Sequence, residues 1–197
     1  RQDKHAFGPH AVALQEAFAQ WNGNPFCMAT NSGTAALHMC VAACGIGAGD
    51  EVITTALSWT SSASCILLHK AIPVFMDVDW ETMLISPSKV EAAITEKTKG
   101  ILVVHYWGIV CDMDPILKIA HRHNLAVIED ACQAIGAEYH GRRAGVLGTM
   151  GCFSFFPTKN LGAAGDGGLI TLDDPDLADR LRQLRVHGDT GGYQHVS

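Results

Sequence analysis

Residues 114–130 read DPILKIAHRHNLAVIED. The pair Asp114-Pro115 is typical of a helix start, and we predict a helix from there through His123. The continuous apolar run at 125–128 is typical of a strand that is covered on both faces, and two acids follow it. A helix that leads into a buried strand is the repeating unit of an α/β protein with a parallel sheet.

The same alternation extends over the rest of the chain. Further helices are predicted from Pro9 onward and at 34–44, 61–69, 89–94 and 175–186. Further strands are predicted at 26–30, 50–54, 72–76, 101–104, 153–156 and 168–172, with a polar turn or hairpin at 139–145. The pattern predicts an α/β fold with a mostly parallel sheet, and such sheets bind ligands at the carboxyl ends of their strands.

Composition indicates a globular protein with a small-molecule ligand. The chain has 197 residues, of which 48% are hydrophobic and 17% charged, so one domain can bury a substantial core. The net charge is -6 without a lysine or arginine cluster, which argues against nucleic acid or an anionic membrane as a partner. No signal peptide and no apolar span of about 20 residues is present, so we predict a cytoplasmic protein.

The seven cysteines lie mostly in apolar segments and form no CxxC pair. Cys40 and Cys44 are four residues apart in a predicted buried helix. Reduced thiols in a core are therefore favoured over a zinc site, and we predict no metal. Because the sequence starts with Arg1 rather than methionine, we expect a segment of a longer polypeptide.

One lysine is placed where a reactive amine is expected. Lys159 follows the apolar run 153–156 and Pro157, and a glycine-rich turn begins at Gly162. Burial favours the unprotonated form of an amine, and an unprotonated amine forms a Schiff base with a carbonyl. This position predicts a buried nucleophile. The alternative is a lysine at a strand end whose stem lies on apolar surface while its amine reaches water.

The segment Asn31-Ser32-Gly33-Thr34 joins a predicted strand to a predicted helix. Backbone N–H groups and hydroxyls at a helix N-terminus suit a phosphate. Helix capping alone is the alternative role for these hydroxyl residues.

Asp130 follows a buried strand, and a buried carboxylate needs a cationic partner. In a pyridoxal phosphate site that partner is the ring nitrogen. A helix N-cap is the alternative for Asp130, and Gln133 either reaches the same ring or completes a capping box. Trp59 lies just past a predicted strand, where it is either a core aromatic or a flat face for a planar heterocycle.

Five motifs together resemble the sugar aminotransferases of the DegT/DnrJ/EryC1/StrS family. They are Asn31-Ser32-Gly33-Thr34-Ala35-Ala36-Leu37, Gly49-Asp50-Glu51-Val52-Ile53, Pro73-Val74-Phe75, Glu129-Asp130-Ala131-Cys132-Gln133 and Phe153-Ser154-Phe155-Phe156-Pro157-Thr158-Lys159-Asn160-Leu161-Gly162. These family members are pyridoxal 5'-phosphate enzymes of aspartate aminotransferase fold, fold type I. The resemblance implies that residues 1–197 form the large cofactor-binding domain, a three-layer α/β/α unit, and that the C-terminal small domain is absent from this chain.

The resemblance also implies the role of each residue. Lys159 would form the Schiff base and transfer the proton, and Asp130 would pair with the pyridine nitrogen. Trp59 would stack on the ring, and Gln133 would contact its phenolic side. The phosphate would be held by Ser32, Gly33, Thr34 and Ser154.

The implied reaction moves an amino group from glutamate or glutamine to a nucleotide-linked keto sugar, in a homodimer with a shared active site. A keto-cyclitol such as an inosose is an alternative acceptor. Two further alternatives are a pyridoxal phosphate-dependent sugar dehydratase, in which a histidine replaces the lysine, and a non-catalytic relative. Lys159 argues against the dehydratase, and the sequence does not separate the two acceptors.

Overall fold

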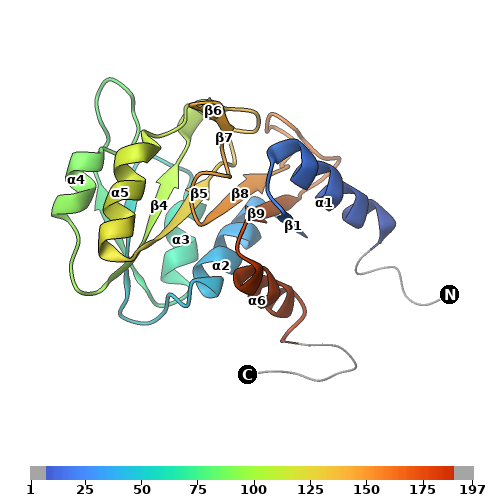
Figure 1. Ribbon diagram of the computed structural model, residues 1–197, viewed down its shortest axis with the longest axis horizontal. Coiled ribbons are helices and arrows are strands. Elements are labelled where there is room, and N and C mark those ends of the chain that lie inside the picture. Colours follow the sequence, from blue (N-terminus) through green and yellow to red (C-terminus); the bar gives the residue numbers. More distant parts are fainter. Residues whose placement is uncertain (1–7, 189–197) are drawn as a thin grey trace.

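A seven-stranded sheet forms the centre of the computed structural model, which describes residues 8–188 (Figure 1). Arg1, on which the expectation of a longer polypeptide rests, lies outside these residues. The strand order is β1-β9-β8-β5-β4-β2-β3. The strands are β1 (Phe26–Thr30), β2 (Glu51–Thr55), β3 (Ile72–Met76), β4 (Thr98–Val104), β5 (Ala126–Asp130), β8 (Met150–Ser154) and β9 (Gly168–Leu172). Among these seven strands, β9 runs antiparallel to β1 and β8, and the other six point in one direction, so the predicted mostly parallel sheet is confirmed.

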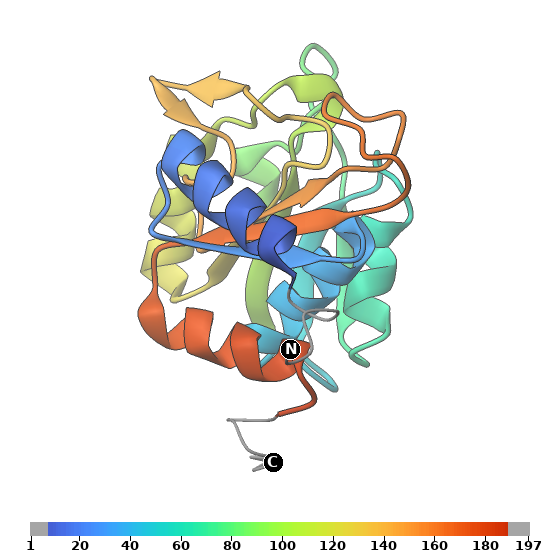
Figure 2. The ribbon, with the colours of Figure 1, turned by 90° about the vertical axis from the view of Figure 1, so that its right-hand side faces the viewer.

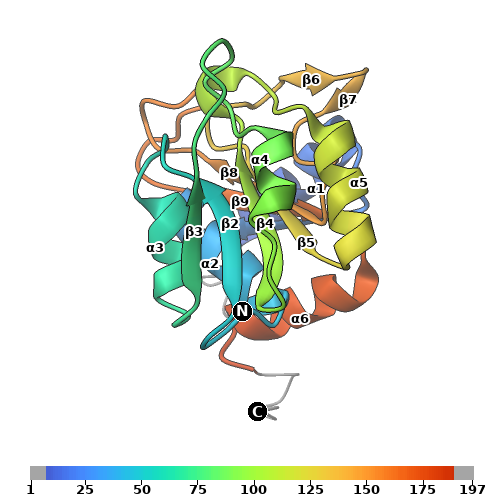
Figure 3. The ribbon, with the colours of Figure 1, turned by 90° about the vertical axis from the view of Figure 1, so that its left-hand side faces the viewer.

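Helices cover both faces of the sheet, as Figure 3 shows for the end with β3, β2 and β4. On one face lie α2 (Gly33–Ala43), α3 (Ser61–Leu67) and α6 (Pro175–Arg185), packed in one apolar cluster. The other face carries α1 (Pro9–Asn22), α4 (Pro87–Ala92) and α5 (Met113–His123), in two further clusters. Figure 2 shows α1 from the side of the β1 edge. The fold therefore has the three layers that the resemblance implied.

Alternate side chains of the central strands enter opposite layers. In β4, Leu102 and Val104 pack toward α2 and α3, whereas Ile101 and Val103 pack toward α4 and α5. All four are nearly or completely buried. A strand buried on both faces needs apolar residues at every position, which is why its sequence shows no alternation.

Several predicted boundaries differ from the observed ones. The strand predicted at 153–156 is β8, which starts at Met150 and ends where its pairing with β9 ends, at Ser154 opposite Gly168. The first residues of β8 escaped prediction because Gly151 is a poor strand former, but a Cβ there would overlap the backbone of Gly145. The helix predicted at 61–69 ends at Leu67. The turn predicted at 139–145 contains a short hairpin, β6 (Glu138–Tyr139) and β7 (Arg142–Arg143).

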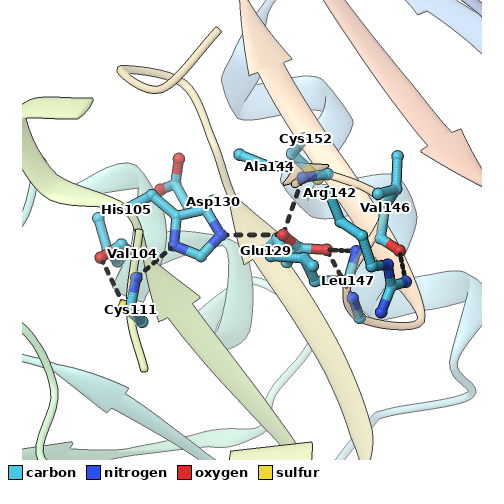
Figure 4. A network of polar contacts seen from close by, with 12 residues as sticks. Val104, His105, Cys111, Glu129, Asp130, Arg142, Ala144, Val146, Leu147 and Cys152 are labelled. Atoms are coloured by element: carbon cyan, nitrogen blue, oxygen red, sulfur yellow. Dashed lines mark hydrogen bonds and ion pairs between the residues drawn. The ribbon is translucent and has the colours of Figure 1, made fainter. Parts of the chain in front are cut away.

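A completely buried carboxylate on β5 organises the loop before β8 (Figure 4). Oε1 of Glu129 accepts hydrogen bonds from the N–H groups of Leu147 at 2.8 Å and Gly148 at 2.6 Å. Its Oε2 accepts from the N–H of Gly145 at 2.8 Å. A buried charge is stable only with such compensation, and here backbone donors from one loop supply most of it.

The imidazole of His105, also completely buried, contributes the fourth hydrogen bond to Glu129 (Figure 4). Its Nδ1 accepts from the N–H of Cys111 at 3.2 Å and so carries no proton. Its Nε2 therefore carries the ring proton and donates to Oε2 of Glu129 at 2.9 Å. This pair ties the segment after β4 to β5, so that segment and the loop before β8 share one anchor.

None of the helices within residues 8–188 has the length and apolar character needed to cross a membrane.

Replacing Glu129 with glutamine should lower the free energy of unfolding by about 3 kcal/mol or more. The amide keeps the shape but directs N–H groups at backbone donors and removes the charge that they compensate. Urea unfolding measures the loss. Glu138→Gln is the matched control, because the Glu138 side chain is 53% exposed and its ion pair with Arg143 is long, at 3.8 Å. A loss below 1 kcal/mol for Glu129→Gln would contradict the role of this anchor.

Candidate active site

A cavity of about 380 Å³ opens at the carboxyl ends of β2, β4, β5 and β8. All eight of the site residues predicted from sequence line it: Ser32, Gly33, Thr34, Trp59, Asp130, Gln133, Ser154 and Lys159. They come from positions 32 to 159 of the chain, and the parallel sheet brings them to one edge. The structure therefore groups the predicted residues around a single concave site.

One end of the cavity is formed by the start of α2. Ser32 is the N-cap, and its Oγ accepts a hydrogen bond from the N–H of Ala35 at 3.1 Å. The capping role is therefore present. A capped helix still leaves N–H groups in its first turn without intrahelical partners, and Gly33 and Thr34 of that turn line the cavity. The capping role and the proposed phosphate role are compatible, because different atoms serve them.

Gly33 allows α2 to approach β8 closely. A Cβ at this position would lie 2.7 Å from Cβ of Ser154 and 2.9 Å from Sγ of Cys132. Real Cβ atoms essentially never approach other heavy atoms so closely. The absent side chain therefore lets the helix N-terminus and the Ser154 hydroxyl share one end of the cavity.

The carboxylate of Asp130 lies in the floor of the cavity and is 6% exposed. Its Oδ2 accepts from Oγ of Ser62 at 2.6 Å, and its Oδ1 accepts from the N–H of Cys132 at 3.2 Å. The N-cap alternative for Asp130 is wrong, because β5 is followed by turns at 132–133 and 135–136, and the next described helix, α6, begins only at Pro175.

Gln133 also lines the cavity, and its Oε1 accepts from the N–H of Trp107 at 3.1 Å. The capping-box alternative for Gln133 is wrong for the same reason, since there is no helix to cap. With Oε1 engaged by a backbone donor, the amide nitrogen is the atom left to serve as a donor toward a ligand.

Two expectations about exposure need correction. The Trp59 side chain is 71% exposed at the cavity, so the core-aromatic alternative is wrong. Lys159 is only partly buried, not a fully buried nucleophile. The reason is that β8 ends at Ser154, and the chain then enters a turn in which the N–H of Lys159 donates to the carbonyl of Phe156 at 2.8 Å.

Sequence reasoning missed several lining residues: Ser58, Ser61, His105, Cys132, Phe156, Thr158 and Asp166. The signal for the serines was available, because Ser58 and Ser61-Ser62 flank Trp59. Burial, and after it the charge of Asp130, raises the pKa of the Cys132 thiol well above its usual range. Cys132 therefore stays protonated and does not compete with Lys159 as a nucleophile.

All seven cysteines are free thiols, four of them buried. Within residues 8–188, no group of three or more histidine, cysteine, aspartate or glutamate side chains is arranged to hold a metal ion.

A model of the DegT/DnrJ/EryC1/StrS aminotransferase family matches residues 1–196. The chain belongs to this family. L-glutamine:2-deoxy-scyllo-inosose aminotransferase of Streptomyces fradiae is 46% identical over 179 residues, which are 91% of this chain and 42% of that protein. GDP-perosamine synthase of Caulobacter vibrioides is 47% identical over 181 residues, which are 92% of this chain and 48% of that one. The chain thus spans about half the length of these relatives.

Solved structures of the DegT/DnrJ/EryC1/StrS family share the fold. DesV of S. venezuelae, in complex with a ketimine intermediate, superposes with a TM-score of 0.93 at 40% identity, covering 97% of this chain and 52% of that one. NtdA of Bacillus subtilis with bound cofactor PMP gives a TM-score of 0.91 at 35% identity, covering 96% and 43%. The fold type I architecture is confirmed, and pyridoxal phosphate is the cofactor of the family.

The cavity of this chain fits pyridoxal phosphate. Its phosphate matches the start of α2, where the side-chain space is left empty at Gly33. Its ring nitrogen, a cation when protonated, matches the buried carboxylate of Asp130. Its carbonyl group forms a Schiff base with an amine, and the amine of Lys159 is available in the lining of the same cavity.

Gly33→Ala should destabilise the protein by about 1–3 kcal/mol, because the new methyl group forces α2 away from Ser154 and Cys132. Denaturant unfolding checks this. Gly47→Ala is the matched control, since a Cβ at Gly47 meets no atom within 4 Å. The control should stay within about 0.5 kcal/mol of the wild type or be slightly more stable. Equal stability of both variants would show that the close approach at Gly33 carries no constraint.

Proposed function

We propose that residues 1–197 are the cofactor-binding domain of a pyridoxal phosphate-dependent aminotransferase. In this proposal the enzyme takes an amino group from glutamate or glutamine and transfers it to a ketone on a nucleotide-linked sugar. The observation that carries the proposal is the meeting of Lys159, Asp130 and the start of α2 around one cavity. The proposed enzyme is a cytoplasmic homodimer with a shared active site.

The residues of this chain would divide the binding of the cofactor among them. Lys159 would hold it covalently through Nζ, and Asp130 would face its ring nitrogen. Trp59 would cover one face of the ring, while Gln133 would donate from its amide nitrogen to the phenolic oxygen. The phosphate would lie on Ser32, Gly33, Thr34 and Ser154. When bound, the cofactor supplies an electron sink for the negative charge left on the substrate carbon after deprotonation.

Proton transfer would then be the work of Lys159. Once the amine of the donor had displaced it from the carbonyl carbon, the freed Nζ would remove the proton from the substrate carbon and return a proton to the cofactor. General acid–base catalysis of this kind contributes about 10²–10⁴-fold to a rate. The ionised carboxylate of Asp130 would keep the ring nitrogen protonated during that transfer. These two residues are the proposed catalytic pair.

A keto-cyclitol is the second candidate for the acceptor. A relative that is 46% identical is named as an aminotransferase of 2-deoxy-scyllo-inosose, and one that is 47% identical is named as GDP-perosamine synthase. Nearly equal identities support a keto-cyclitol as the second candidate. Assaying the complete protein in its aminated form with a keto-cyclitol and with a nucleotide-linked keto sugar separates the two.

Borohydride reduction after incubation with pyridoxal phosphate should fix the label on Lys159, as peptide mass mapping will show. Reduction makes the bond between amine and carbonyl carbon permanent, so the labelled peptide identifies the amine. Lys159→Ala should abolish the label, whereas Lys118→Ala, at an exposed position on α5, should retain it. Labelling of other lysines without Lys159 in the complete protein would remove the support for an aminotransferase and favour a non-catalytic role.

Asp130→Asn should lower kcat of the glutamate half-reaction on the order of a hundredfold. The amide keeps the size but loses the charge that opposes the ring cation, and removing one such electrostatic partner typically costs this much. Stopped-flow absorbance of the cofactor follows the rate. Asp112→Asn is the control, because Asp112 is exposed, and it should react like the wild type. A wild-type rate for Asp130→Asn would exclude the proposed pairing.

A further inference from the structure

Three polar groups form a chain that leads from the cavity wall to Asp130. Oγ of Ser58 lies 2.6 Å from Oγ of Ser62, and Oγ of Ser62 donates to Oδ2 of Asp130 at 2.6 Å. We propose that Ser62 is a positioning residue, which orients the Asp130 carboxylate toward the ring nitrogen of the cofactor, with Ser58 supporting it. This inference rests on the proposed function and adds a residue to it.

The direction of each hydrogen bond follows from the chemistry of the groups. A serine hydroxyl has a single proton, and that of Ser62 is used on the carboxylate. The short contact between the two serines therefore requires Ser58 to donate to Ser62. Ser58 lines the cavity, whereas Ser62 is 1% exposed. Ser62 thus has one donor and one acceptor role, and both are filled inside the protein.

The two anchors of Asp130 differ in what they can fix. The N–H of Cys132 reaches Oδ1 from two residues along the chain, so it constrains only the local turn. Ser62 reaches Oδ2 from α3, 68 residues away in sequence. With one donor on each oxygen, the plane of the carboxylate is set, and its remaining lone pairs are available to the cavity. Only the Ser62 contact ties that plane to another element of the fold.

The first turn of α3 connects several parts of the proposed site. The N–H of Ser62 donates to the carbonyl of Trp59 at 3.2 Å, so the residue that anchors Asp130 also holds the backbone of the proposed stacking residue. The adjacent Ser61 lies 2.8 Å from Thr34 between their hydroxyl oxygens, at the start of α2. Ser62 therefore couples the position of the carboxylate to the position of the Trp59 backbone.

A purely structural role for Ser62 is the competing explanation, since a buried hydroxyl needs an acceptor in any case. The two explanations predict different effects of a Ser62 substitution on cofactor binding. A positioning residue acts on the contact between Asp130 and the ring nitrogen, whereas a structural residue acts on the whole cavity. An analogue with carbon in place of that nitrogen, 1-deazapyridoxal phosphate, distinguishes them.

The experiment measures the dissociation constants of pyridoxal phosphate and of the deaza analogue for the complete protein. The variants are Ser62→Ala, Ser62→Cys, Ser62→Thr and Ser58→Ala, with Ser64→Ala on the same helix as the control. The wild type and the control should prefer pyridoxal phosphate. Ser62→Ala and Ser62→Cys, which lack a strong donor, should bind pyridoxal phosphate about tenfold more weakly and bind the analogue unchanged. Ser62→Thr keeps a hydroxyl donor and should therefore prefer pyridoxal phosphate over the analogue, as the wild type does. Ser58→Ala should bind pyridoxal phosphate about threefold more weakly than the wild type.

The outcomes separate this inference from the proposed function. If the wild type binds pyridoxal phosphate on Lys159 and Ser62→Ala weakens both ligands equally, or neither, Ser62 is structural and the inference fails while the proposed function stands. If the wild type binds neither ligand, both fail. Should Ser62→Ala not fold, Ser62→Cys and Ser62→Thr give the same comparison between a weak and a strong donor.

Discussion

The hydrogen-bonded carboxylate of Glu129 is the constraint that ties the loop before β8 and the segment after β4 to the central strand β5. It takes three backbone donors from the loop before β8 and one from His105 after β4, and the side chains of Glu129 and His105 are completely buried. Because a buried charge tolerates no missing partner, these two loops cannot shift independently. This anchor also fixes part of the cavity wall, because β4 and β8 lie on either side of β5 and each contributes a lining residue.

The alternation of side chains along β5 gives adjacent acids opposite functions. Glu129 points into a layer where three backbone N–H groups and the His105 imidazole donate to its two oxygens. Asp130 points to the face with α2 and α3, where one serine and one N–H leave lone pairs of its carboxylate free. A one-residue shift of β5 would turn each of these side chains to the opposite face of the sheet. The register of the strand therefore decides which of the two acids faces the cavity. The pairing of Val104 with Asp130 and of Asp130 with Cys152 holds that register from both sides.

Local patterns predicted the α/β alternation and the strand before Asp130, because buried parallel strands and helix starts leave strong signals. Position in the sequence predicted Lys159 as a nucleophile and left two alternatives for Trp59, the resemblance to a family implied stacking on a cofactor ring, and the structure places both residues at one cavity. Ser62 was not predicted as a site residue, because it contacts Asp130 from 68 positions away in the sequence, and no local pattern contains such a contact. The extent of β8 escaped because glycine weakens a strand pattern, although here its lack of a side chain is what packing requires.

The exposure of the aromatic residues bears on how the proposed reaction excludes water. Trp59 is 71% and Phe156 48% exposed at a cavity whose chemistry depends on a carboxylate and an amine. Electrostatic contacts of this kind are worth more when water is removed. An apolar rim beside a polar floor is suited to being covered by another protein surface, and the proposed homodimer would supply one. In that proposed arrangement Asp130 and Lys159 would orient the cofactor from this chain, and the covering surface would complete the wall of the cavity opposite them.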